Sequence, residues 1–134
     1  MKKVILPGLV AGFLMSVVGM AVSMLMGKAI PTLMAEYKNV AMFRPWEDPL
    51  MMLFFAHPFV LGLALAYVWD KIKGSLSGNK AVSFAFGVFL VATIPGMFIT
   101  YCSFQVSLAM TLSWTVTGLV NALVAGLVLS KMNG

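Results

Sequence analysis

The chain has 134 residues, of which 61% are hydrophobic and only 10% are charged. A soluble domain carries about 25% charged residues, and a chain as apolar as this one would expose large apolar areas to water. The composition therefore excludes a soluble globular protein and predicts an integral membrane protein. The net charge of +5 does not indicate nucleic-acid binding, because the nine Lys and Arg residues are spread over loops and helix ends.

The first apolar stretch follows Lys2 and Lys3, as the apolar region of a signal peptide would. It is longer than the roughly 7–15 residues of such a region, and no convincing cleavage site ends it. We therefore expect an uncleaved first span. Cys102 is the single cysteine of the sequence and cannot form an intramolecular disulfide, so it does not indicate a compartment.

Long runs without Asp, Glu, Lys or Arg predict four membrane spans. A helix needs about 20 apolar residues to cross the hydrocarbon core. The first two runs are Val4–Gly27 and Pro49–Trp69, and the third, Ala81–Ser130, is long enough for two spans and a tight turn. We predict one all-α membrane domain over residues 1–134, a four-helix transmembrane bundle with spans at about 4–27, 49–69, 81–100 and 109–130.

Small residues recur every three or four positions in the first and last spans and so lie on one helix face. They are Gly8, Gly12, Ser16 and Gly19 in the first span, and Gly118, Ala122 and Gly126 in the last. In lipid, such stripes allow two helix backbones to approach closely. Two interpretations remain open, a packing seam within the monomer and an interface between copies in a homo-oligomer.

The loop between the first two spans, residues 28–48, mixes apolar and charged residues. Its segment Thr32–Val40 predicts a short amphipathic helix lying in the membrane interface. On that helix we expect Glu36, Tyr37 and Lys38 to face water or lipid headgroups. This loop carries most of the charged residues that are not simple flanking lysines, so it is a candidate functional region.

The end of this loop reads Phe43-Arg44-Pro45-Trp46-Glu47-Asp48-Pro49. Its two prolines forbid a continuous helix, and we expect Asp48 to cap a helix that starts at Pro49. Arg44 can pair with the carboxylate of Glu47 or Asp48, and Trp46 fits the membrane surface. The group is either a salt bridge and cap that fixes the loop, or a lip that binds a ligand or partner.

Pro58 and Pro95 lie inside the second and third spans, and each predicts a kink because proline cannot donate a hydrogen bond to the preceding turn. His57 lies roughly 12 Å from the start of its helix, at about 1.5 Å per residue, and so near the middle of the membrane. An ionisable residue at that depth is a functional candidate. Three roles remain open for His57: a neutral side chain bonded to a neighbouring helix or to the carbonyl freed by Pro58, a group that handles a ligand or proton, and a metal or haem ligand.

Asn121 is the second polar residue that we single out within a span, and we expect it to hydrogen-bond across a helix interface. No other recognised chemical motif is present. A metal site needs several ligands, and the sequence has no second His or Cys and no acidic residue within a span. We therefore expect no metal, no cofactor and no catalytic residues, and membrane lipids with a second copy or another membrane subunit as partners.

The basic residues predict the topology. The side that holds both termini carries more of them than the other side, which by the positive-inside rule places the termini in the cytoplasm of a prokaryotic cell. The two groups are Lys2, Lys3, Lys71, Lys73, Lys80 and Lys131 on the terminal side, and Lys28, Lys38 and Arg44 on the other.

Several short stretches resemble small four-span prokaryotic integral membrane proteins of unknown function. They are Phe43–Pro49, His57-Pro58-Phe59, Tyr67–Lys71 and Thr93–Met97. This resemblance covers most of the chain but implies no activity and no functional residue. Small multidrug transporters are similar only in size, because that family relies on a membrane-embedded Glu in its first span, where this chain has none.

Two functions are compatible with the sequence. The first is a non-enzymatic accessory subunit or interaction module, which agrees with the close-packing stripes and with the lack of charge inside the spans. The alternative is a small homo-oligomeric channel or transporter that uses His57 and Asn121, supported by the two proline-interrupted helices.

Overall fold

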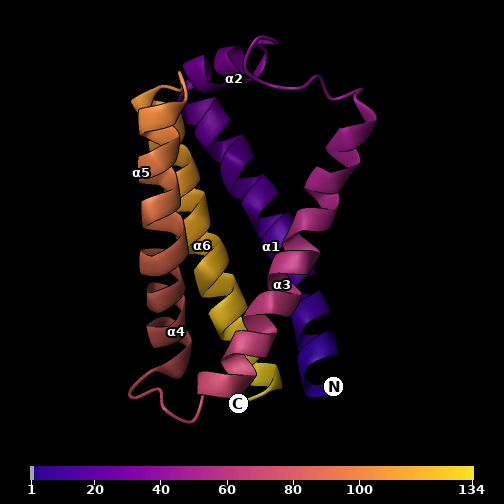
Figure 1. Ribbon diagram of the computed structural model, residues 1–134, viewed down its shortest axis with the longest axis vertical. Coiled ribbons are helices and arrows are strands. Elements are labelled where there is room, and N and C mark those ends of the chain that lie inside the picture. The colour runs from indigo at the N-terminus through magenta and orange to yellow at the C-terminus, as the bar shows by residue number, and fades with distance from the viewer. Residues whose placement is uncertain (1) are drawn as a thin grey trace.

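The computed structural model describes residues 2–134 and confirms an all-helical bundle (Figure 1). Four helical segments in this range are long and apolar enough to cross a membrane, as predicted: Lys3–Ala29, Pro49–Ile72, Lys80–Ser103 and Leu108–Met132. Each extends slightly beyond the predicted span, because lysines at helix ends can reach the headgroups with their long side chains. The elements are α1 (Lys2–Ala29), α2 (Pro31–Tyr37), the 3₁₀ turn η1 (Pro49–Met51), α3 (Met52–Ile72), α4 (Lys80–Val88), the π-helical turn η2 (Phe89–Thr93), α5 (Ile94–Ser103) and α6 (Leu108–Met132).

Helices α1 and α3 cross near the middle of the molecule (Figure 1). Their backbones touch at the crossing, because Gly8 and Gly12 of α1 face Gly62 of α3. A Cβ atom added to Gly12 would lie 2.7 Å from the Cα of Phe59, closer than real Cβ atoms approach. The small residues of the first span therefore pack within the chain itself, and they fix the point about which α1 and α3 diverge.

Helix α6 lies between α1 and the span formed by α4, η2 and α5, and its small residues are also used inside the chain. A Cβ on Gly118 would meet the side chain of Thr93 at 2.6 Å, and Gly126 faces the backbone of Ala81. The small residue on the α1 side of this interface is Gly19, which packs against the Asn121 amide. Neither glycine stripe is left as a free face.

The end of the bundle that holds both termini, called here the terminal end, contains the larger core cluster. Trp69 is fully buried, and its ring packs edge-on against Phe84 with centroids 5.2 Å apart. The indole Nε1–H of Trp69 donates to the carbonyl oxygen of Asn133 at 2.9 Å, and Lys73 Nζ donates to the Asn133 side chain at 2.6 Å. The last turn of α3 is thereby tied to the chain terminus after α6.

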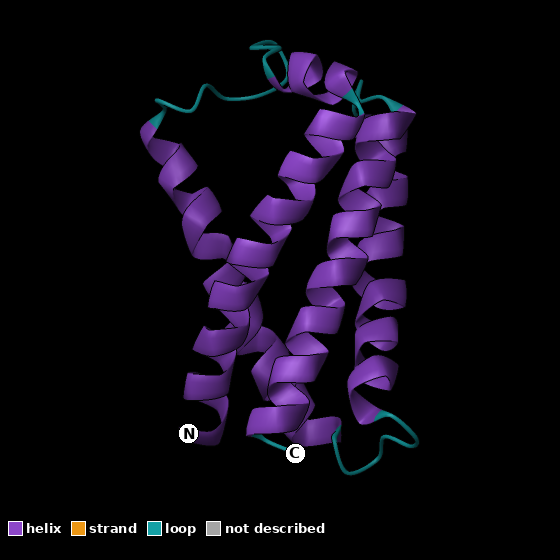
Figure 2. Cartoon of the chain, turned by 180° about the vertical axis from the view of Figure 1, so that it is seen from behind, coloured by secondary structure: helices purple, strands orange, loops and turns teal. Residues whose placement is uncertain are grey.

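At the opposite end, called here the α2 end, α2 lies across the end of α1, while the start of α3 stands apart from it (Figure 2). The predicted interfacial helix exists, but it ends at Tyr37 rather than Val40. Lys38 is exposed, as expected, whereas Glu36 and Tyr37 are half-buried and also contact other parts of the chain. Glu36 accepts hydrogen bonds from the backbone N and the hydroxyl of Ser107, at 2.8 and 2.6 Å, because these donors are unpaired at the start of α6.

The two internal prolines act differently. Pro58 lies inside α3, which continues as an α-helix from Met52 to Ile72. Pro95 lies just after η2, where the α-helical pattern changes to a π-helical turn. Because Pro95 has no N–H to donate to Val91, the wider turn is a local solution to the missing hydrogen bond. The interruption predicted for the third span is therefore located at residues 89–93.

Candidate functional site

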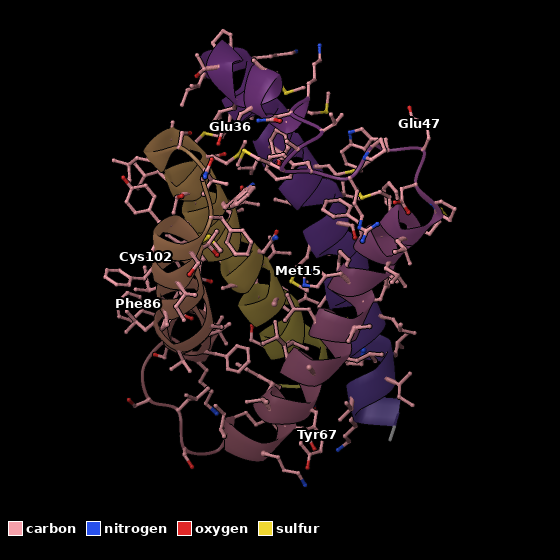
Figure 3. All side chains as sticks on the ribbon, turned by 45° about the horizontal axis from the view of Figure 1, so that its top comes forward. Met15, Glu36, Glu47, Tyr67, Phe86 and Cys102 are labelled. Atoms are coloured by element: carbon pink, nitrogen blue, oxygen red, sulfur yellow. The ribbon has the colours of Figure 1, made fainter. Side chains whose placement is uncertain are left out.

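A half-open cavity of about 230 Å³ lies between α1, α3, η2 and α6, with Met15 on its wall near the centre of the bundle (Figure 3). It exists because α3 diverges from α6 beyond the α1–α3 crossing. Most of its wall is apolar, from residues such as Leu61, Leu65 and Ala122. The polar side chains on the wall are those of His57, Thr93, Trp114, Thr117 and Asn121.

The cavity lies at mid-membrane depth. Thr93 and Asn121 are each close to the middle of the span that carries them, and Met15 is close to the middle of the first span. His57 lies in the first half of its span, on the arm of α3 that is directed toward the α2 end. Any opening between α3 and η2 at this depth faces hydrocarbon rather than water.

Two of the polar groups on the wall are already used. The Thr117 hydroxyl donates to the carbonyl oxygen of Ser113 at 2.9 Å, which is a low-cost arrangement in a helix. The indole N–H of Trp114 donates to the Tyr37 hydroxyl, so one wall of the cavity is linked to α2. The side chains that make no hydrogen bond among the described residues are His57 on α3, Thr93 on η2 and Asn121 on α6.

His57 is exposed and lines the cavity from α3. Within residues 2–134 its ring makes no hydrogen bond to another part of the chain, so the bond to a neighbouring helix or to the carbonyl freed by Pro58 does not form. The reason is geometric, because the side chain projects into the space where α3 has left its neighbours. The ring nitrogens therefore remain available for an occupant of the cavity.

Asn121 does not make the hydrogen bond across the helix interface that we expected. Its Oδ1 atom is buried and has no hydrogen-bond partner among the described residues. The reason is that the residue facing it on α1 is Gly19, which offers no polar side chain. An unpaired buried oxygen of this kind costs about 1–3 kcal/mol.

The second candidate site, at the start of α3, is built on Asp48. Arg44 Nη1 donates to Asp48 Oδ2 at 2.8 Å, and the backbone N of Leu50 donates to Asp48 Oδ1 at 2.9 Å. The backbone hydrogen bond from Leu50, and then the Arg44 guanidinium, lower the pKa of Asp48 below its usual value. Asp48 therefore acts both as the helix cap and as the partner of Arg44.

The other two residues singled out in this loop do not join that pair. Glu47 is exposed and takes part in no ion pair among residues 2–134. Trp46 is 61% exposed, and its ring packs edge-on against Phe54 with centroids 5.7 Å apart. None of these loop residues lines the cavity, so the structure separates the sequence-derived candidates into two sites.

Sequence reasoning missed Thr93 and Trp114 as wall residues, and it missed Glu36 as the partner of Ser107, the residue that caps α6. In the sequence, Thr93 is marked by its place beside the proline break at Pro95. The contact of Glu36 with Ser107 depends on how α2 folds back, so no local pattern in the sequence indicates it. Among the described residues, no group of three or more His, Cys, Asp or Glu side chains is placed to hold a metal ion.

Comparison of the chain with models of protein families, with curated proteins and with solved structures gave no match.

Proposed function

We propose that the protein is a non-enzymatic accessory or interaction module of the membrane, and that it works as a homodimer. The observation that carries this proposal is the exposure of α3 between the α2 end and the crossing. Four consecutive residues, Met52, Leu53, Phe54 and Phe55, are 71%, 66%, 55% and 49% exposed. Because successive helix residues point to all sides, no helix of the same chain covers this part of α3.

The exposed arm of α3 can pair with the same arm of a second copy. Two copies related by a two-fold axis present the same surface patch to each other, so the side chains of Leu53 and Phe54 can pack together. In lipid, van der Waals packing contributes to helix association. The cavity is lined by His57, Leu61 and Leu65 of α3 and is not part of this proposed contact.

Native mass spectrometry of the full chain released from lipid nanodiscs tests this proposal. We expect a dimer of fixed stoichiometry that dissociates when Leu53 and Phe54 are both replaced by Ala. The matched control is Leu127→Ala, which shortens a leucine of similar exposure, 49%, on α6. A monomeric wild type, or a stoichiometric subunit of another sequence, would overturn the homodimer.

We also infer that the protein resides in the cytoplasmic membrane of a prokaryote, with both termini in the cytoplasm. The termini lie at the same end of the bundle (Figure 1), and the basic residues are more numerous on that side. In a Cys102→Ser background, a membrane-impermeant maleimide added to intact cells should label Asn39→Cys and leave Ser75→Cys unlabelled. The opposite labelling pattern would reverse the topology.

The second candidate function is a small homo-oligomeric channel or transporter. The cavity favours it, because His57 and Asn121 both line it at mid-membrane depth beside the π-helical turn η2. For this function, replacing His57 by Ala would abolish a pH-dependent flux across proteoliposomes. Unchanged flux with weakened assembly would favour the interaction module.

A further inference from the structure

The cavity has the properties of a binding site for a small molecule, and this holds for a single chain whether or not it dimerises. All parts of its wall belong to one chain, from α1, α3, η2 and α6. The cavity lies beside the α1–α3 crossing, where the backbones of Gly12 and Gly62 are in close contact and fix the place at which the two helices diverge.

Its depth limits how an occupant arrives. The wall residues Thr93 and Asn121 lie near the middle of their spans, and exposed Ala92 and His57 border the opening. An occupant enters sideways from the hydrocarbon, so it must be soluble in lipid and carry no net charge.

Its volume limits the size of the occupant. A cavity of about 150 Å³ with an apolar lining binds benzene, whereas pockets for drug-sized ligands begin near 300 Å³. The observed volume of about 230 Å³ lies between these values. It suits one substituted ring, with any long chain attached to that ring left outside in the lipid.

Its unused polar groups define the chemistry of that ring. Asn121, His57 and Thr93 line the cavity from α6, α3 and η2, and none of them is hydrogen-bonded within the described residues. The Thr93 hydroxyl is a further donor and acceptor on the wall, and the unpaired Oδ1 of Asn121 is buried beside Gly19. Rotation of the Asn121 amide presents either an acceptor or a donor, and a neutral imidazole offers one of each. A ring that carries oxygen atoms at opposite positions can satisfy both side chains at once, which an acyl chain cannot do.

We propose that this cavity binds the single-ring head group of a lipid-soluble quinone or its phenolic, reduced form, held between Asn121 and His57. The apolar wall receives the ring faces, and the lateral opening lets the hydrocarbon tail of the ligand run into the bilayer. Binding alone is proposed, with no electron or proton transfer. The site differs from the dimer surface, which uses the outward-facing side chains of Leu53 and Phe54.

Trp114 provides a reporter, because its ring lines the cavity. The full chain with Trp46 replaced by Phe is placed in phosphatidylcholine nanodiscs and titrated with a decyl-substituted benzoquinone. Trp69 contributes a constant background, since it is fully buried at the terminal end. We expect the tryptophan emission to fall in a saturable manner, at one quinone per chain, and the decyl quinol to compete for the same site.

Substitutions on two different helices keep the test independent of folding. Asn121→Leu and His57→Phe should each weaken saturable quenching about tenfold, the change expected from losing roughly one hydrogen bond. The control is Thr115→Val, a near-isosteric change on α6 at a residue whose hydroxyl donates to Thr111 and which does not line the cavity. His57 is exposed and unbonded, so its replacement leaves the packing of the bundle unchanged.

Three results would overturn the proposal. The first is quenching that rises linearly and equally in all variants, which indicates partition of the quinone into lipid alone. The second is equal competition by decylbenzene, which would mean that the polar groups have no role. The third is quenching of Trp114 by lipids brominated in mid-chain that the quinone does not relieve, which would identify an acyl chain as the occupant. If native mass spectrometry shows that the protein is not a dimer, each of these fluorescence measurements still tests quinone binding.

Discussion

The two ends of α3 differ in how they are packed. At the terminal end, Trp69 is fully buried and bonded to Asn133. At the α2 end of the same helix, Phe54 and Phe55 are about half exposed, at 55% and 49%. The exposed end is the more apolar of the two in sequence, because the terminal end also carries Asp70 and Lys71, so hydrophobicity does not decide which of them is packed.

The cause of the difference is the crossing of α1 and α3. Gly62 meets Gly8 and Gly12 there with backbone contact, which acts as a fixed pivot. On one side of the pivot α3 approaches α4 and α6, and on the other side it leaves them. The terminal end of the bundle is therefore tightly packed, whereas on the other side of the crossing polar side chains such as His57 make no hydrogen bond within the described residues.

The largest predicted effect comes from opening the packed end. Replacing Trp69 by Ala should lower the free energy of unfolding by about 3–5 kcal/mol, because it leaves a large cavity and removes the hydrogen bond to Asn133. Unfolding in mixed micelles, followed by circular dichroism, measures this change. Trp46→Ala is the matched control, and it should have little effect because Trp46 is 61% exposed. Equal losses in the two variants would contradict a stability difference between the ends.

The next effect comes from disturbing the pivot itself. Gly62→Ala places a methyl group against the backbone of Gly12, with the nitrogen of that residue 2.7 Å away. We expect a loss of about 1–3 kcal/mol, the usual cost of overpacking, together with a change in the accessibility of His57. The control is Gly87→Ala, because a Cβ at Gly87 would meet nothing within 4 Å. If both alanine variants behave like wild type, the crossing is not a rigid pivot.

Much of the fold was predictable from the sequence. The uncharged runs located all four spans, and the prolines indicated where the third span is irregular. The cap at Asp48 followed from its place before Pro49, and the structure confirms that Asp48 accepts from Leu50 N. These features are local, since each depends on residues that are neighbours in the chain.

The site was less predictable because it depends on how helices are arranged. Asn121 and His57 stood out as polar residues within spans, but no local pattern indicates that they line one cavity. The sequence also leaves open whether Arg44 pairs with Glu47 or Asp48. The structure resolves this, because only Asp48 also faces the freed N–H of Leu50. The contact of Glu36 with Ser107 joins residues far apart in the chain, and it required the fold of α2.

A smaller effect is expected where α2 meets the start of α6. Glu36→Gln removes the negative charge that accepts two hydrogen bonds at the start of α6. We expect a loss of about 0.5–1 kcal/mol, since charge at a helix N-terminus contributes about that much. Amide hydrogen exchange at the first turn of α6 should increase. Glu47→Gln serves as the control, and a similar increase in that variant would show that general charge, rather than the contact with Ser107, is responsible.

The smallest predicted effect is the loss, at low pH, of the stability that the Asp48 carboxylate contributes to the loop before α3. The pKa of Asp48 is lowered in the folded protein, so its contribution to stability is present above its unfolded value of 3.8 and is lost as the pH falls through the lower folded value. Trp46 lies in the same loop against Phe54, so its emission should report the loss below about pH 4. The Asp48→Asn variant should lack this acid transition, while Glu47→Gln should retain it because Glu47 joins no ion pair among the described residues. An unchanged acid transition in Asp48→Asn would mean that another group controls the loop. The two ends of α3 would then differ in packing alone and not in their response to pH.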